Sequence, residues 1–361
     1  MAGDLNPSDE LAGFGRRFVP RIDRFLSAFY RSKIDASDHS FMKDLYSELG
    51  KYTAREGKRI RPLLVILGYL GYGGRVSGTG EIVKFASAVE LMHSMLLVQD
   101  DIIDRSPLRR GEKSFHVVLS EKYAGLTGND SLGSDIALVL ADVMFSNALQ
   151  IVYSARAGKG ARDRFVRIFA DTYETTAFGQ VLDSLNSLPA AIAPRNEVPG
   201  LISTMKTAYY TVYYPLLMGC ALAGGDSDSE KNLIREFSLP LGLAFQIRDD
   251  IFGIFGNDSD TGKPSDSDIR EGKLTQLIQD ASDSLEGAER ERFISAFTSR
   301  EKSGRDVEYV RSMVRESGAL DRARKTHAGL VARADSLAAT LNFSPEYAPV
   351  LAGVIGMVRE L

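Results

Sequence analysis

Apolar residues recur every three or four positions along most of this chain, whereas runs typical of β-strands are scarce. The segment from about residue 80 to residue 105 shows this most clearly. Val83, Ala86 and Val89 fall on one helical face within it. A helix of that length is unusual in a small domain and common in a large helical bundle. The periodicity therefore predicts an all-α fold built from long helices.

The same periodicity predicts several more helices, separated by short clusters of Gly, Pro, Ser and Asp. None of these clusters is long enough to serve as an interdomain linker. We therefore expect one all-α domain over residues 1–361, with residues 1–15 forming a loosely ordered N-terminus. The further expected helices span about residues 61–69, 135–155, 162–187, 199–223 and 229–252.

The overall composition excludes several classes of function. A formal net charge of -4 gives no general attraction for nucleic acid. No apolar run approaches the ~18 residues of a membrane span, and the acidic first ten residues do not resemble a signal peptide. A single cysteine, Cys220, cannot form an intrachain disulfide, which fits a cytoplasmic setting. We expect no nucleic-acid partner and no membrane span.

Two distant segments each place a double aspartate at the end of an apolar helical run. They are LLVQDDIID (96–104) and FQIRDDIFG (245–253). In a bundle, two long helices can face each other, so their acidic ends can form a single acidic mouth. The repeated pattern therefore predicts one site built from both segments.

The first acidic cluster has the spacing of a metal site. Asp100 and Asp104 are one helical turn apart, with Asp101 about 100° around the helix. Carboxylates packed this closely repel one another unless a cation lies among them, and oxygen ligands alone favour Mg²⁺ or Mn²⁺. A solvated acidic helix end is the ordinary alternative. Apolar residues before the cluster and cations after it favour a buried diphosphate site; these cations are Arg105, Arg109, Arg110 and Lys113.

A basic cluster precedes a predicted helix at residues 57–62, where Lys58 and Arg61 stand in the string GKRIRP. An ordinary basic first turn is the alternative, but cations are unfavourable at a helix N-terminus unless an anion joins them. The second acidic cluster, Asp249 and Asp250, has Gly253 where the first has its third aspartate. We interpret these groups as parts of one polyphosphate–metal pocket.

The chain resembles the trans-isoprenyl diphosphate (polyprenyl) synthases, most closely the geranylgeranyl diphosphate synthases, over roughly residues 50–280. Six motifs occur in the order and approximate spacing of that family, which makes the resemblance highly specific. They are GKRIRP, DDIIDRSPLRRG, GQVLD (179–183), KTAYY (206–210), FQIRDDIFGIFG and TGKPSDSDIREGK.

The resemblance implies a homodimer of all-α subunits, each with a central substrate cavity and three Mg²⁺ ions that Mn²⁺ can replace. Its implied metal ligands are Asp100, Asp101 and Asp104 for two ions and Asp249 for the third, with Asp250 and Asp268 in support. The resemblance implies that Arg109 and Lys263 bind the allylic diphosphate, with Lys206 and Gln246 nearby. It implies that isopentenyl diphosphate is bound by Lys58, Arg61, His93 and Arg110. Gln180 and Lys273 are further implied substrate-binding residues.

The resemblance also implies the reaction, in which an allylic diphosphate ionises and couples head-to-tail to isopentenyl diphosphate. Lys206, Thr207 and Gln246 are the implied residues that steady the allylic cation. Released pyrophosphate is a plausible base, so no protein general base is assigned. Short-product members often carry an aromatic residue four or five places before the first aspartate, where this chain has Leu96 and Met95. We therefore expect a C20 product, with longer or C15 products as alternatives.

Two other functions share part of this pattern. Terpene cyclases and head-to-head coupling enzymes also use DDxxD in helical bundles, but cyclases need no isopentenyl diphosphate anchor such as GKRIRP. A non-catalytic subunit of a heteromeric synthase usually loses the first aspartate triad, which is kept here.

Overall fold

The computed structural model describes residues 7–109, 111–125, 131–186, 198–225, 227–256, 266–299 and 301–361. These parts are almost entirely helical, which confirms the predicted all-α class. The helices of the first half are α1 (Pro7–Asp35), α2 (Ser40–Thr53), α3 (Ile60–Gly71), η1 (Val76–Gly78), α4 (Thr79–Ile103), α5 (Phe115–Tyr123), α6 (Leu132–Ser154) and α7 (Lys159–Asn186). Between α4 and α5 lies a short hairpin of β1 (Leu108–Arg109) and β2 (Glu112–Lys113).

The second half begins with one continuous helical stretch whose middle is a π-helix. This stretch consists of α8 (Val198–Ile202), the π-helix η2 (Ser203–Tyr213) and α9 (Tyr214–Ala223). It is followed by α10 (Asp228–Phe255), α12 (Ser267–Glu271), α13 (Gln276–Asp283), α14 (Gly287–Thr298), α15 (Gly304–Glu316), α16 (Ala319–Ala338) and α17 (Ala348–Arg359).

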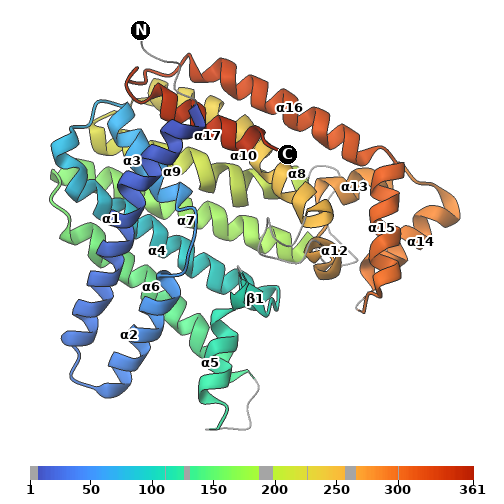
Figure 1. Ribbon diagram of the computed structural model, residues 1–361, viewed down its shortest axis with the longest axis horizontal. Helices are drawn as coiled ribbons and strands as arrows, with labels where there is room; N and C mark the ends of the chain where they lie inside the picture. Colours follow the sequence, from blue (N-terminus) through green and yellow to red (C-terminus); the bar gives the residue numbers. More distant parts are fainter. Residues whose placement is uncertain are drawn as a thin grey trace.

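Helix α4 lies at the centre of the bundle and is buried almost all round from Ile82 to Met95. It packs against α3, α6 and α1, while α10 packs against η2 and α16. Figure 1 shows α4, α7 and α10 running through the middle of the molecule, with α1 and α2 on one side and α12 to α15 at the opposite end. The apolar core falls into a large cluster around α4 and a smaller one formed by the end of α10 and α12 to α16.

The expectation of a loosely ordered N-terminus over residues 1–15 is wrong for residues 7–15, which form the first turns of α1. The reason is an apolar stripe at helical spacing, which includes the buried Phe14 and Phe18. Helix α17 packs against α1, and Gly353 allows the closest approach, because a Cβ there would lie 2.3 Å from the carbonyl oxygen of Pro7. Residues 1–6 lie outside the described part of the chain.

Helix α6 is long and apolar enough to span a bilayer by length and composition, which the reading of the sequence did not anticipate. A core helix of a folded bundle passes the same test. Here α6 packs against α4 and α5, and Ala137, Ala141, Met144 and Ala148 are fully buried. These contacts account for the apolar residues on the buried face of α6, whereas Leu138, Val139 and Tyr153 of the same helix are exposed.

Candidate active site

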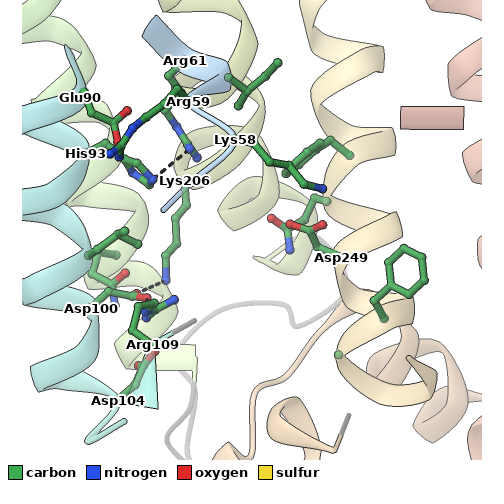
Figure 2. A pocket seen from close by; sticks show the side chains of 18 of the residues that line it. Lys58, Arg59, Arg61, Glu90, His93, Asp100, Asp104, Arg109, Lys206 and Asp249 are labelled. Carbon is green, nitrogen blue, oxygen red and sulfur yellow. Dashed lines mark hydrogen bonds and ion pairs between the residues drawn. The ribbon is translucent and has the colours of Figure 1, made fainter. Parts of the chain in front are cut away.

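A cavity of about 1270 Å³ lies between α4, α7, η2 and α10, and its walls carry most of the predicted site residues. Asp100 and Asp104 come from α4, and Asp249 comes from α10. Figure 2 shows Asp249 on the opposite side of the cavity from the two α4 aspartates. The two acidic helix ends therefore face one shared space.

Two cations hold the first acidic group in place. Arg109 donates to Asp101 Oδ1 at 2.7 Å from Nε and to Asp100 Oδ2 at 3.0 Å from Nη2. Lys206 of η2 donates to Asp100 Oδ1 at 3.0 Å. Asp100 thus lies between two cations, whereas Asp101 is fully buried against Arg109 and does not line the cavity.

Asp183 of α7 is a site residue that the sequence reasoning did not identify. Its carboxylate accepts from Lys206 Nζ at 2.8 Å and lines the cavity. It is the last residue of the GQVLD motif, in which only Gln180 was assigned. The available signal was its spacing of three from Gln180, which puts both side chains on one helical face.

The electrostatics of this wall favour added positive charge. Burial raises the pKa of Asp104 above its usual range, and the negative charge of Asp100 raises it further. Burial alone would lower the pKa of Lys206, but the carboxylates of Asp100 and Asp183 raise it overall. The carboxylates repel one another and already attract the available cations, as expected of groups that bind a metal.

The second acidic group, on α10, has one carboxylate in the cavity and one behind it. Asp249 lines the cavity, and burial raises the pKa of its carboxyl. Asp250 is buried, which raises its pKa to about 7, and it accepts from Gln246 Nε2 at 2.7 Å. The Gln246 Oε1 in turn accepts from the hydroxyl of Thr207. This chain of contacts fixes the Gln246 amide at the cavity wall.

Gly253 leaves room for a carboxylate from another element. A Cβ at position 253 would lie 2.4 Å from Oδ2 and 2.6 Å from Cγ of Asp268, on α12. Lys273 Nζ lies 3.9 Å from both Asp268 Oδ2 and Asp250 Oδ1. The carboxylate of Asp268 therefore occupies the space that a side chain at position 253 would need.

A basic group lies about two turns before Asp100 on α4, at the level of His93. Arg61 Nη1 lies 3.3 Å from His93 Nε2, and its Nη2 donates to Thr211 Oγ1 at 2.8 Å. His93 Nδ1 lies 2.8 Å from the hydroxyl of Tyr210, and the Arg61 guanidinium lies over the Tyr210 ring. The Nε of Arg61 is buried and has no hydrogen-bond partner among the described residues. Together with Lys58, which lines the same cavity, this arrangement suits an anion.

The π-helix η2 positions Lys206 and Thr207 between two glycines. A Cβ on Gly179 of α7 would lie 3.0 Å from the Lys206 nitrogen, and one on Gly242 of α10 would lie 2.4 Å from Ala208 Cα. Such close backbone approach is possible only because both positions lack a side chain. π-Helical turns are frequent at functional sites, and in this one Lys206 donates to Asp100.

Most of the predicted site residues thus line one cavity, and a few lie in the layer of residues directly behind those that line it. Thr207, Asp101 and Asp250 do not line it but contact residues that do. Arg110 and Lys263 lie outside the described residues. The predicted residues that line the cavity are Lys58, Arg61, His93, Asp100, Asp104, Arg109, Gln180, Lys206, Gln246, Asp249, Asp268 and Lys273.

The donor set fits Mg²⁺ that is held jointly with a phosphate ligand. In the described part of the chain, no three acidic, histidine or cysteine side chains are already gathered closely enough to enclose an ion. Mg²⁺ does not need such a cage, because it usually takes one or two carboxylates and completes its shell with water and substrate phosphate. Asp100, Asp104 and Asp249 supply oxygen ligands of this kind on two walls of the cavity.

Comparisons with known proteins agree with this geometry. The family model for polyprenyl synthetase matches residues 43–314. A geranylgeranyl diphosphate synthase of Saccharolobus solfataricus is 29% identical over 86% of this chain and 85% of its own length. A geranylfarnesyl diphosphate synthase of Aeropyrum pernix is 30% identical over 77% of this chain and 81% of its own length.

The fold comparison gives the same result. The crystal structure of a geranylgeranyl pyrophosphate synthase from Corynebacterium glutamicum, complexed with isoprenyl diphosphate and magnesium, superposes with a TM-score of 0.86. It is 26% identical and covers 96% of this chain and 98% of its own. The chain belongs to the polyprenyl synthetase family and is a prenyltransferase with the all-α fold of the isoprenyl diphosphate synthases.

Proposed function

We propose that the protein condenses isopentenyl diphosphate head-to-tail with an allylic prenyl diphosphate and releases an all-trans C20 prenyl diphosphate. The observation that carries this proposal is the single cavity onto which both acidic helix ends and the basic group open. The acidic end around Asp100 and Asp249 suits a diphosphate held through Mg²⁺, and the basic end around Lys58 and Arg61 suits a second diphosphate held directly. One cavity thus offers two diphosphate subsites.

One group of residues would then bind the allylic diphosphate, and another group would bind isopentenyl diphosphate. Asp100, Asp104 and Asp249 would hold Mg²⁺, which would supply positive charge to stabilise a pyrophosphate leaving group. Arg109 and Lys206 already lie at Asp100 and would add positive charge beside the same leaving group. Lys58, Arg61 and His93 would hold isopentenyl diphosphate, so that its double bond can attack the allylic cation after the bond to the diphosphate oxygen has broken.

The allylic cation that forms would be stabilised by nearby electron density and would be consumed by any strong nucleophile. Gln246 would supply this electron density, because its amide is fixed by Thr207 on one side and Asp250 on the other. Loss of a proton from the isopentenyl-derived unit restores the alkene, and the departing pyrophosphate is the base we assign. The preorganised dipoles would lower the barrier without reorganising during the reaction.

Product analysis tests this proposal directly. Purified protein is incubated with labelled isopentenyl diphosphate, Mg²⁺ and each of the C5, C10 and C15 allylic diphosphates, and the products are resolved by mass spectrometry. Incorporation of label with growth to C20 supports the proposal. Consumption of the allylic diphosphate alone would indicate a cyclase or a head-to-head coupling enzyme, and no consumption of either substrate would indicate a non-catalytic subunit.

The C20 assignment rests on the residues that precede Asp100 on α4. Met95 is only 1% exposed and Met92 is fully buried one turn further from the aspartates. Neither Met95 nor Leu96 is aromatic. A flexible methionine yields space to a growing chain more readily than a rigid ring of comparable size, so the path beside α4 would admit a tail longer than C15.

Met95→Phe is expected to shorten the main product from C20 toward C15, because the ring would block the path of the tail beside α4. Mass spectrometry of products made from the C5 and C10 starters measures the change. Met313→Phe is a matched control, since Met313 is also buried but belongs to the smaller core cluster. An unchanged product distribution for Met95→Phe would refute this placement of the tail.

We also propose that the protein is a cytoplasmic homodimer. Among the described residues, six of the fourteen exposed large apolar side chains lie on α6 and α7, which pack against each other. They are Leu138, Val139, Tyr153, Phe178, Val181 and Leu185.

Exposed apolar groups concentrated in this way are typical of a protein–protein interface. Light scattering is therefore expected to give twice the chain mass of 39.5 kDa. Val139→Glu combined with Val181→Glu is expected to give the single-chain mass. A wild-type protein of 39.5 kDa at micromolar concentration would contradict the dimer.

A further inference from the structure

Arg59 has an unusual backbone conformation between two residues of the basic group. Its φ of 48° and ψ of 33° are left-handed, and it directly precedes α3. Among the described residues only one other non-glycine residue, Arg105, has a positive φ. A left-handed conformation is unfavourable for a residue with a Cβ and persists only where surrounding contacts hold it. The contacts of the Arg59 side chain must therefore stabilise this turn.

The guanidinium of Arg59 is buried and donates four hydrogen bonds within the protein. Nη1 donates to Glu90 Oε1 at 2.6 Å, and Nε donates to Asp23 Oδ1 at 3.0 Å. Nη2 donates to the carbonyl oxygens of Thr53 at 3.0 Å and Arg55 at 2.9 Å. The side chain is 4% exposed, as is expected of an arginine whose planar fork is matched by several acceptors. The side chain is therefore held within the protein, at the edge of the cavity.

The partners of Arg59 tie the α2–α3 connection to two other helices. Glu90 lies on α4, one helical turn before His93, and Asp23 lies on α1. Figure 2 shows Arg59 and Glu90 side by side, next to Arg61 and His93. The α2–α3 connection and the first turn of α3 thus each contact the same face of α4, through Arg59 to Glu90 and through Arg61 to His93.

We propose that Arg59 is a positioning residue for the isopentenyl diphosphate subsite, held in its left-handed turn by Glu90 and Asp23. With Arg59 fixed, Lys58 and Arg61 on either side of it present their charges to the cavity. This inference rests on the proposed function, because it assumes that this basic group binds isopentenyl diphosphate.

The effect of this contact should be confined to one substrate. Glu90 and Asp100 lie on the same helix but ten residues apart, which is about 15 Å at 1.5 Å per residue. Among the described residues, Arg59 makes no hydrogen bond to the two residues that hold Asp100, namely Arg109 and Lys206, although Arg59 and Arg109 border one small cavity. Loosening Arg59 should therefore disturb the isopentenyl diphosphate subsite and leave the allylic subsite in place.

Glu90→Gln tests the proposal, because it keeps the size of the side chain and removes its charge. The KM for isopentenyl diphosphate is expected to rise on the order of tenfold or more, since small displacements of binding groups are costly. The KM for the allylic diphosphate and the kcat at saturation should change by less than about twofold. Glu81→Gln is the matched control, because Glu81 also lies on α4 and pairs with Lys84 at 2.9 Å, away from the basic group.

Asp23→Asn provides a second test on the more exposed partner, whose side chain is 42% exposed, and it should raise the same KM by a smaller factor. Arg59→Lys should raise it as well, because lysine cannot reach all four acceptors. Equal changes in both KM values, or a fall in kcat that follows a lower melting temperature, would overturn the proposal. So would unchanged kinetics in all three variants. If the wild-type enzyme forms no product at all, the proposed function fails instead.

Discussion

Gly253→Asp is expected to lower activity sharply, although it would complete a second DDxxD motif. The new Cβ would lie 2.4 Å from Oδ2 of Asp268, so Asp268 would have to move away from its position near Lys273. Two carboxylates would then compete for one space beside the buried Asp250, which already has a raised pKa. We expect kcat/KM to fall on the order of a hundredfold. Initial rates over a range of Mg²⁺ concentrations measure the effect.

The reason for this outcome can be tested by moving the carboxylate. If Asp268 fills the place of the missing aspartate, Gly253→Asp combined with Asp268→Ala should recover part of the lost activity. Gly329→Asp is the control, because a Cβ at Gly329 of α16 meets nothing within 4 Å, and this variant should behave like wild type. Higher activity or tighter Mg²⁺ dependence in Gly253→Asp alone would show that Asp268 does not serve this role.

Gly242→Ala is expected to impair both stability and catalysis. Its Cβ would lie 2.4 Å from Ala208 Cα and 2.7 Å from Ala208 Cβ, so the π-helix η2 would have to shift. Overpacking of this kind typically costs about 1–3 kcal/mol. The shift would also move Lys206 and Thr207, and we expect kcat to fall on the order of a hundredfold. Urea unfolding and steady-state kinetics measure the two effects separately.

A second glycine provides the comparison for this substitution. Gly329→Ala adds the same methyl group to a helix where there is space for it. It should be neutral or slightly stabilising, since alanine favours helices over glycine by about 1 kcal/mol. If Gly242→Ala keeps wild-type kcat, the close approach of α10 to η2 is not needed to place Lys206.

The general fold could be predicted from sequence because it depends on patterns that repeat over many residues. The expected helix at about residues 80–105 corresponds to α4, and the pair of acidic helix ends does face one cavity. Each of these predictions rests on helical periodicity, which is a pattern formed by many residues and is therefore evident in the sequence. The beginning of α1 was not predicted because the apolar stripe around Phe14 was overlooked.

Other features depend on single contacts between distant parts of the chain, which periodicity does not report. Residues 203–213 form a π-helix that packs closely against Gly179 and Gly242, which are remote in sequence. The burial of Asp101 follows from its pairing with Arg109. The engagement of Arg59 by Asp23 and Glu90 joins three segments that are remote in sequence.

The account depends on the ends of α4 and α10 acting together on one diphosphate. The most direct measurement is a crystal structure with an unreactive thio analogue of an allylic diphosphate and Mn²⁺, which anomalous scattering locates. The account predicts metal ions between the diphosphate and Asp100 and Asp104 on one side, and between the diphosphate and Asp249 on the other. Metal ions on only one helix end, or a diphosphate bound away from both, would contradict it.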